Sequence, residues 1–383
     1  MAICITLMLA VSSPLVFAYP PDPDNAALLY YQAYLLYQQP DDTTGDMLVK
    51  LAKGKIEPNE KIKQYVESCR SAIHYATAAA DMQHCNWGLK YSDGFSACFP
   101  HLAQARQLSW LIIADARILA AEGAYQQALD RCLTARKISQ HVGDETLISF
   151  LVGVAIRKMA DSCIQDILGQ MPQDVETLTW LKNQLLTVPS RELSVKATLE
   201  TEQQIALETM YLENVEERIE MFSENIAGDI EELLQNADED FFQRSRDYYK
   251  NHMACLQAVL SAPTPYEKTY VELEKLTEKS QKDAAKDTAA ALTAAIAPAM
   301  CKVYGHQVRT QAWANAIRAA VDIYIINAKT GQLPEALCAD VPKDPFSEAD
   351  FEYETTKDGF VLRCQAKDLE KDEIHQYEFK IPK

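Results

Sequence analysis

The chain has 383 residues, of which 55 are aspartate or glutamate and 37 are lysine or arginine, giving a formal net charge of -18 at pH 7. This negative charge disfavours a nucleic-acid backbone or an anionic lipid surface as a partner, because both would be repelled. A chain of this length exceeds what one hydrophobic core usually organises, so two or three packed units are expected. Only 12 glycines occur, and long stretches lack proline, which favours helix as the dominant element.

The first eighteen residues, Met1–Ala18, have the features of an export signal. Ala2–Ala18 contains no charged side chain, and Val16 and Ala18 fit the two positions that a signal peptidase inspects. This predicts cleavage after Ala18 and a secreted protein of the periplasm or cell envelope. Because no lysine or arginine lies near Met1, retention of the segment as a short anchor stays open. No later segment is apolar enough to span a bilayer, so no stable membrane insertion is expected after cleavage.

Residues 19–302 are predicted to form a helical domain, because helical periodicity recurs almost throughout them. Asp24 and Asn25 can cap the first helix of this domain. We expect long helices packed as antiparallel hairpins in a bundle, in preference to a filament-forming coiled coil. The fold class is therefore mainly α.

Two segments of this domain carry wide apolar faces. In Asp144–Leu168 the apolar surface includes Ile148 and Leu151, which predicts that this surface is buried. A later acidic segment carries apolar residues spaced by three and four, which are Tyr211, Val215, Ile219, Phe222, Ile226, Ile230 and Leu233. The spacing indicates a stripe against a partner helix, with glutamates facing outward. That segment lacks histidine, so a glutamate–histidine metal site inside a bundle is not expected.

A helix hairpin is predicted on either side of Gly123, which permits a tight reversal. Its small and aromatic positions resemble one tetratricopeptide repeat, and they are Ala116, Gly123, Tyr125, Ala128 and Ala135. Asp115 and Gln140 depart from the repeat pattern, and no second copy follows at a period near 34. One such hairpin cannot build a solenoid.

The last part of the chain, residues 303–383, is predicted to be a separate α+β module. One helix ending at Gly331 is followed by three alternating segments typical of short antiparallel strands, which are Phe351–Thr355, Phe360–Cys364 and Tyr377–Ile381. With "QLP" after the helix and "DPFS" before the first strand, this order resembles the carboxyl-terminal half of type II secretion pseudopilins. The resemblance implies the small fold alone, because the polymerising amino-terminal helix and a recognisable calcium loop at Asp368–Glu373 are missing.

The wider arrangement resembles an exported bacterial family with no assigned activity. The resemblance rests on "CNWGLKYSDGFSACFPHLAQARQLSWLI", on "AEGAYQQALDRC", on "ETLISFLVGVAI" and on the pilin-like end. It covers about Cys85 to Lys383 and implies no catalytic residues.

Cysteine is the residue type that offers the most chemistry. Cys4 lies in the predicted signal, so nine of the 10 cysteines would remain after cleavage, an odd number that leaves one thiol unpaired. A Cys85–Cys98 disulfide would close the glycine-containing loop and contribute on the order of 3 kcal/mol. Cys338 and Cys364 are a second candidate pair, whereas Cys132 and Cys163 lie on apolar helix faces typical of small core residues.

The same loop offers two further hypotheses. His84 and His101 could join Cys85 and Cys98 in a zinc site, although the loop lacks a C-x-x-C motif. Buried, unpaired thiols at Cys85 and Cys98 are a further alternative. Three aromatic residues of the loop are candidates for stacking on a sugar or peptide, and they are Trp87, Tyr91 and Phe95. The alternative is that these side chains pack beneath the loop.

No catalytic motif is present: the chain has no H-E-x-x-H, no G-x-S-x-G and no phosphate-binding glycine loop. We therefore expect a protein without cofactor that is not an enzyme, acting as a cell-envelope binding or scaffold protein through a protein partner. The alternative is an envelope hydrolase with a site near residues 84–101. The identity of the partner and the oligomeric state do not follow from the sequence.

Cleavage after Ala18 predicts a mature chain that starts at Tyr19. Amino-terminal sequencing of the protein from an envelope fraction measures this directly. Recovery of Met1 or Ala2 as the first residue would contradict cleavage and would favour the anchor.

Overall fold

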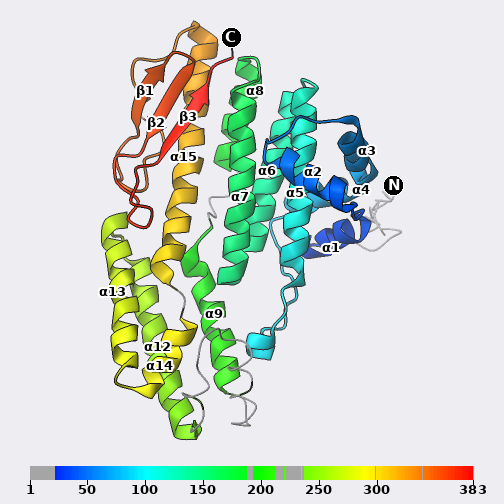
Figure 1. The fold of residues 1–383 in the computed structure, drawn as a ribbon. Helices are drawn as coiled ribbons and strands as arrows, with labels where there is room; N and C mark the ends of the chain where they lie inside the picture. The colour runs from blue at the N-terminus through cyan, green and yellow to red at the C-terminus, as the bar shows by residue number, and fades with distance from the viewer. Residues whose placement is uncertain are drawn as a thin grey trace, which may run out of the picture.

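The computed structural model describes residues 22–187, 193–211, 220, 234, 237–297, 299–338 and 340–382. These residues form a mainly helical structure with a small antiparallel sheet near the carboxyl terminus (Figure 1). The predicted fold class is therefore confirmed. Within the described residues no helix is both long and apolar enough to cross a membrane. The predicted signal segment and most of the acidic stripe, namely Val215, Ile219, Phe222, Ile226, Ile230 and Leu233, lie outside the described residues.

Four short helices begin the described chain, and their starts follow from capping side chains. They are α1 (Ala26–Leu36), α2 (Asp42–Ala52), α3 (Glu60–Ser68) and α4 (Arg70–Ala80). The side chain of Asn25 accepts a hydrogen bond from the backbone N–H of Ala27 at 3.1 Å, as the sequence predicts. Asp41 and Asn59 cap α2 and α3 in the same way. These helices cover one side of the central bundle (Figure 1).

The central bundle contains α5 (Pro100–Ala121), α6 (Tyr125–Gly143), α7 (Leu147–Leu168) and α8 (Val175–Thr187). Gly123 has a φ of +80° between α5 and α6, a left-handed conformation that favours glycine. The predicted helix hairpin is therefore confirmed. A 3₁₀ helix, η1 (Tyr91–Ser96), lies in the long loop between α4 and α5.

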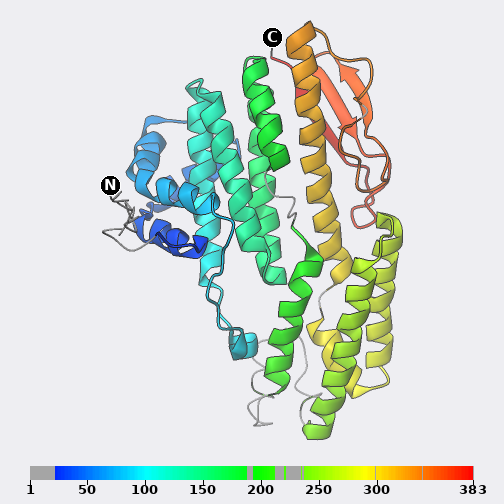
Figure 2. The same cartoon turned by 180° about the vertical axis from the view of Figure 1, so that it is seen from behind.

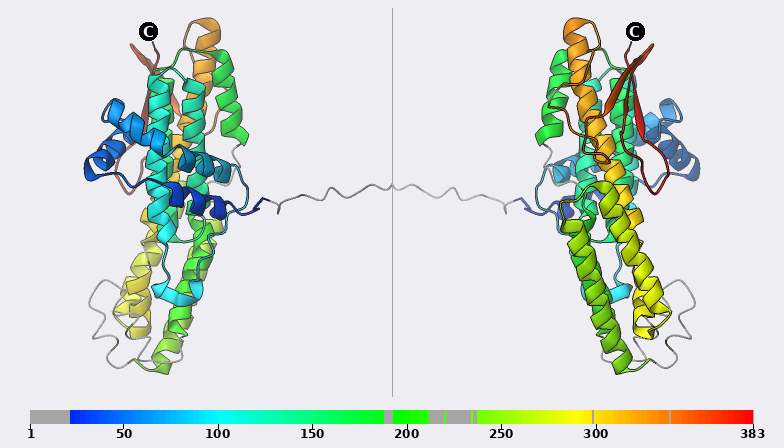
Figure 3. Two further views of the ribbon diagram at one scale, coloured as in Figure 1. Left: turned by 90° about the vertical axis from the view of Figure 1, so that its right-hand side faces the viewer. Right: turned by 90° about the vertical axis from the view of Figure 1, so that its left-hand side faces the viewer.

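The second half of the helical part extends the molecule away from this bundle (Figures 2 and 3). It contains α9 (Val195–Met210), α12 (Glu239–Ser261), α13 (Tyr266–Ala284) and α14 (Thr288–Ile296). The long helix α15 (Met300–Thr330) then returns beside α7 and α8. It ends at Gly331, whose φ of +73° is a left-handed cap.

The carboxyl-terminal sheet packs against α15. Its strands β1 (Glu352–Thr356), β2 (Gly359–Arg363) and β3 (Gln376–Lys380) are antiparallel in the order β1-β2-β3. Phe360 pairs with Phe379 in the register, and the ring of Tyr324 on α15 lies 5.5 Å from that of Phe360. The Tyr324 hydroxyl also donates to the carbonyl of Lys380 at 2.7 Å. The predicted boundary near residue 302 falls in the first turn of α15 and stays a prediction.

One prediction about α7 is wrong. Ile148 and Leu151 are 53% and 41% exposed, although the sequence predicts a buried surface around α7. The helices that contact α7 are chiefly α5, α6 and α15, and the residues they cover include Phe150, Val154 and Ile164. A wide apolar face can thus be covered on one side only, because packing partners determine which part is buried.

The interface of α6 and α7 contains a buried ion pair. Arg136 Nη1 on α6 lies 3.2 Å from Asp161 Oδ1 on α7, and the two side chains are 2% and 1% exposed. Burial of one such charge without the other is costly, because water no longer solvates it. Removing either charge alone would therefore leave the other buried without a counter-charge.

Asp161→Ala should lower the free energy of unfolding by about 3–5 kcal/mol, because it leaves the Arg136 guanidinium buried without a counter-charge. The double variant Arg136→Met/Asp161→Leu should recover most of this loss. Urea unfolding followed by circular dichroism measures both. The control is Asp46→Ala, which removes a solvent-exposed ion pair with Lys50 and should cost less than about 1 kcal/mol. Equal losses in Asp161→Ala and Asp46→Ala would contradict this.

Candidate functional site

The loop between α4 and α5 is fixed by an aromatic cluster in which Trp87 is central. Trp87 is only 3% exposed, and its ring stacks on His101 at 4.5 Å and on Tyr30 at 5.3 Å. Its indole N–H donates to the carbonyl of His141 at 2.9 Å. The ring of Trp87 thus faces the protein interior, where it is shielded from a ligand in solvent.

The other two aromatic candidates lie further along this loop. Tyr91 is half-buried, and its pKa is raised by burial and by the carboxylate of Glu145. The backbone N–H of Phe95 donates to Thr209 Oγ1 on α9 at 3.0 Å. Gly94 beside it has a φ of +56°, and a Cβ there would lie 2.2 Å from the same hydroxyl. The loop therefore ties α9 to the central bundle.

The predicted disulfides are not present in the structure. Cys85, Cys98, Cys338 and Cys364 are all free. Cys85 is half-buried beside the aromatic cluster, and burial raises the pKa of its thiol to about 12. Cys98 is exposed at the other end of the loop, where its thiol donates to the carbonyl of Ser96 at 3.6 Å. Cys338 is exposed while Cys364 is buried, so the members of each pair lie in different environments.

The zinc alternative also lacks a formed site. Among the described residues, no three histidine, cysteine, aspartate or glutamate side chains are arranged to hold a metal ion. His101 instead stacks on Trp87 and is 1% exposed, and neither of its ring nitrogens has a hydrogen-bond partner within the described part of the chain. His84, Cys85, Cys98 and His101 therefore do not converge.

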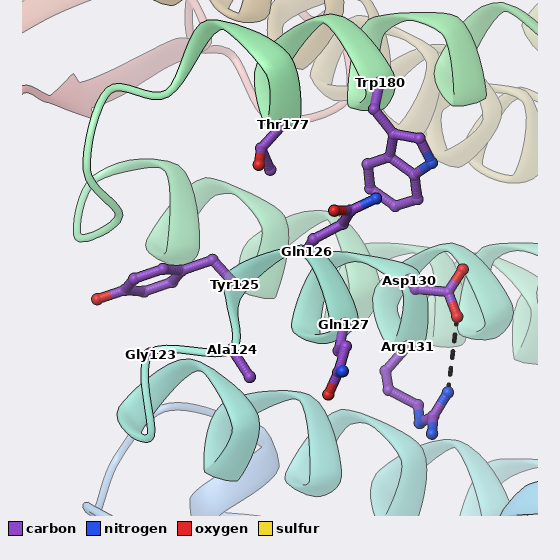
Figure 4. Close-up of a pocket in the computed structure, with 9 residues that line it drawn as sticks. All are labelled: Gly123, Ala124, Tyr125, Gln126, Gln127, Asp130, Arg131, Thr177 and Trp180. Atoms are coloured by element: carbon purple, nitrogen blue, oxygen red, sulfur yellow. Dashed lines mark ion pairs between the residues drawn. The ribbon is translucent and has the colours of Figure 1, made fainter.

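A hollow of about 710 Å³ opens between the start of α6 and α8 (Figure 4). We call it the Trp180 groove. Its lining residues are mostly polar and are Gly123, Ala124, Tyr125, Gln126, Gln127, Asp130, Arg131, Thr177 and Trp180. Trp180 points from α8 toward Gln126 on α6 (Figure 4). The groove thus offers the flat ring of Trp180 beside two carboxamides that can each donate and accept hydrogen bonds.

The charged end of the groove is held by a buried carboxylate. Asp115 on α5 is 1% exposed, and it accepts a hydrogen bond from Arg131 Nε at 2.8 Å. Arg70 on α4 donates to both oxygens of the same carboxylate at 3.0 Å. Arg131 also lies 3.6 Å from Asp130. The guanidinium of Arg131 is therefore oriented by the protein before any ligand binds.

Arg131 also joins the Trp180 groove to a second hollow. This hollow has a volume of about 440 Å³ and is lined by Arg70, Ser71, Ile73, His74, Tyr75, Thr77 and Arg131. The first hollow is thus lined chiefly by α6 and α8, and the second by α4 together with Arg131 of α6. Sequence reasoning found Tyr125 and Asp115 only as matches to or departures from a repeat pattern, and it missed Trp180. The available signal was a tryptophan placed outside the apolar positions Leu178, Leu181 and Leu185 of this segment.

Comparison of the chain with protein-family models finds no match. Searches of curated proteins and of solved structures also return no match.

Burial lowers the pKa of His101 to about 4, below the value of about 6.5 in an unfolded chain. The unfolded state therefore binds this proton first as the pH falls. The stability from neutral His101 is complete above pH 6.5 and is lost between about pH 6.5 and 4. Urea unfolding should show that the free energy of unfolding is lower at pH 5 than at pH 7. In His101→Phe this difference should be smaller by roughly 1–3 kcal/mol. His74→Phe, at an exposed position, is the control. Identical pH dependence in His101→Phe and the wild type would contradict this.

Proposed function

We propose that this protein is an exported cell-envelope binding protein or scaffold, and that it binds an extended polypeptide segment in the Trp180 groove. The observation that carries the proposal is the combination of Trp180, Gln126 and the pre-oriented Arg131 in one open hollow. Export rests on the signal-like segment Met1–Ala18. The tetratricopeptide-like and pseudopilin-like resemblances remain part of this proposal.

The chemistry of the groove fits a peptide chain. The carboxamides of Gln126 and Gln127 can pair with backbone N–H and C=O groups, which every extended segment presents at regular intervals. The ring of Trp180 can pack on an apolar side chain, as aromatic anchors do in many interfaces. Arg131 can pair with a carboxylate of the bound segment.

The hydrolase alternative has less support. Glu145, His101 and Cys85 near the 84–101 loop have shifted pKa values, and burial is the first cause in each case. Shifted pKa values do occur at catalytic sites. However, Trp87 and His101 are 3% and 1% exposed, so a substrate could reach them only after the loop opened.

Photo-crosslinking from the groove tests the proposal. With p-benzoylphenylalanine in place of Thr177, exposure of the envelope fraction to light should yield adducts that protease digestion removes. Adding Trp180→Ala should reduce the adduct yield about tenfold or more, because a central aromatic anchor is commonly worth 2 kcal/mol or more. Gln126→Ala should reduce the yield less, because a neutral hydrogen bond contributes about 1 kcal/mol. Trp110→Ala, at a half-buried tryptophan on α5 outside the groove, is the matched control. Equal yields with and without Trp180→Ala would contradict the proposal.

A further inference from the structure

Helices α6 and α7 run antiparallel, and their side chains meet in a regular register. From one contacting pair to the next, the residue number falls along α6 and rises along α7. The pairs in order are Gly143 with Gly153, Ser139 with Arg157 and Arg136 with Asp161. Cys132 lies one turn before Arg136 on α6, and the turn of α7 that follows Asp161 contains Cys163, so the packed helices bring these two cysteines to the same level of the interface.

The two thiols are in contact at that position. The side chains of Cys132 and Cys163 interact with each other, and both are 0% exposed. The interaction with Cys132 lowers the pKa of Cys163, burial opposes this effect, and the nearby Arg117 adds to it. Arg117 is itself fixed by Asp166 at 2.8 Å and by the carbonyl of Ala52 at 3.1 Å.

We propose that Cys132 and Cys163 are the disulfide-forming pair of this protein, linking α6 to α7. In the structure both are free thiols. The other pairs predicted from sequence lack this facing geometry, because in each of them one member is exposed while the other is at least half-buried. Facing positions on packed elements are what the short Cβ separation of a disulfide requires.

Disulfide formation at this pair is a two-electron oxidation by thiol–disulfide exchange with an external disulfide, such as glutathione disulfide. The thiolate of one cysteine attacks the external disulfide and releases one thiol. The second cysteine then attacks the mixed disulfide and releases the other thiol. Both S–H bonds are lost and one S–S bond forms, while the oxidant becomes two thiols. Because both sulfurs are covered in the folded state, exchange takes place before α6 and α7 close over each other.

The link would brace the helix that carries the Trp180 groove, since Cys132 directly follows Arg131 in α6. It would also close a chain loop of about 30 residues, which restricts the unfolded state. The inference needs an oxidising compartment to operate in the cell. Disulfide formation does not depend on ligand binding in the Trp180 groove, and its test uses purified protein. Failure of either proposal therefore leaves the other standing.

The test is refolding of the full chain from urea with glutathione disulfide, followed by alkylation under denaturing, non-reducing conditions and peptide mapping. A variant with serine at the exposed cysteines Cys98, Cys255 and Cys338 is run in parallel to suppress mixed pairing. We expect a linked Cys132–Cys163 peptide and a melting temperature on the order of 5 °C above that of the reduced protein. Alkylation of both cysteines, or linkage of either to another cysteine in both proteins, overturns the proposal.

Two double variants separate this pair from the others. Cys85→Ala/Cys98→Ser should keep the redox-dependent rise in melting temperature. Cys132→Ala/Cys163→Ala should melt at one temperature with or without oxidant. A redox-dependent rise that persists in Cys132→Ala/Cys163→Ala overturns the proposal, and peptide mapping of the wild type decides the matter if this variant does not fold.

Discussion

The close packing of α6 against α7 is the constraint on which the rest of the structure depends. A Cβ on Gly153 would lie 2.7 Å from the carbonyl oxygen of Ser139 and 3.0 Å from Gly143 Cα, so the helices approach where glycine leaves space. Such an approach excludes water from the interface. Arg136 and Asp161 are therefore buried together, and their mutual attraction at 3.2 Å offsets part of the hydration that each has lost.

This packing places the two ends of α6 in different roles. The carboxyl end supplies His141, whose carbonyl accepts from Trp87 and whose ring nitrogen lies 2.9 Å from the Tyr30 hydroxyl. That end therefore holds the 84–101 loop and α1. The amino end carries Gln126 and Arg131 toward solvent beside α8. The same helix thus links the rigid aromatic cluster to the open groove.

The carboxyl-terminal sheet is joined to the helical body by a second buried charge. Asp368 is 0% exposed, and it accepts hydrogen bonds from Arg309 Nη1 on α15 and lies 2.8 Å from His375 Nε2. Burial alone would raise the pKa of Asp368, but His375 and Arg309 lower it to about 2. The positive charge beside the Asp368 carboxylate is thus that of Arg309 on α15. The sheet and α15 are consequently fixed to each other by an ion pair as well as by aromatic contacts.

The sequence by itself determined the elements whose signals are local. Side-chain caps such as Asn25, the reversal at Gly123 and the alternation of Phe360 with Leu362 depend on neighbours a few residues away, so the helices, the hairpin and the three strands were predictable. Tertiary structure alone decided which surfaces are buried and which cysteines meet. Ile148 is exposed although it belongs to the apolar surface of α7, and Cys132 meets Cys163 because α6 and α7 pack side by side. Spacing along the chain carries no information about such contacts, which depend on how distant elements pack in space.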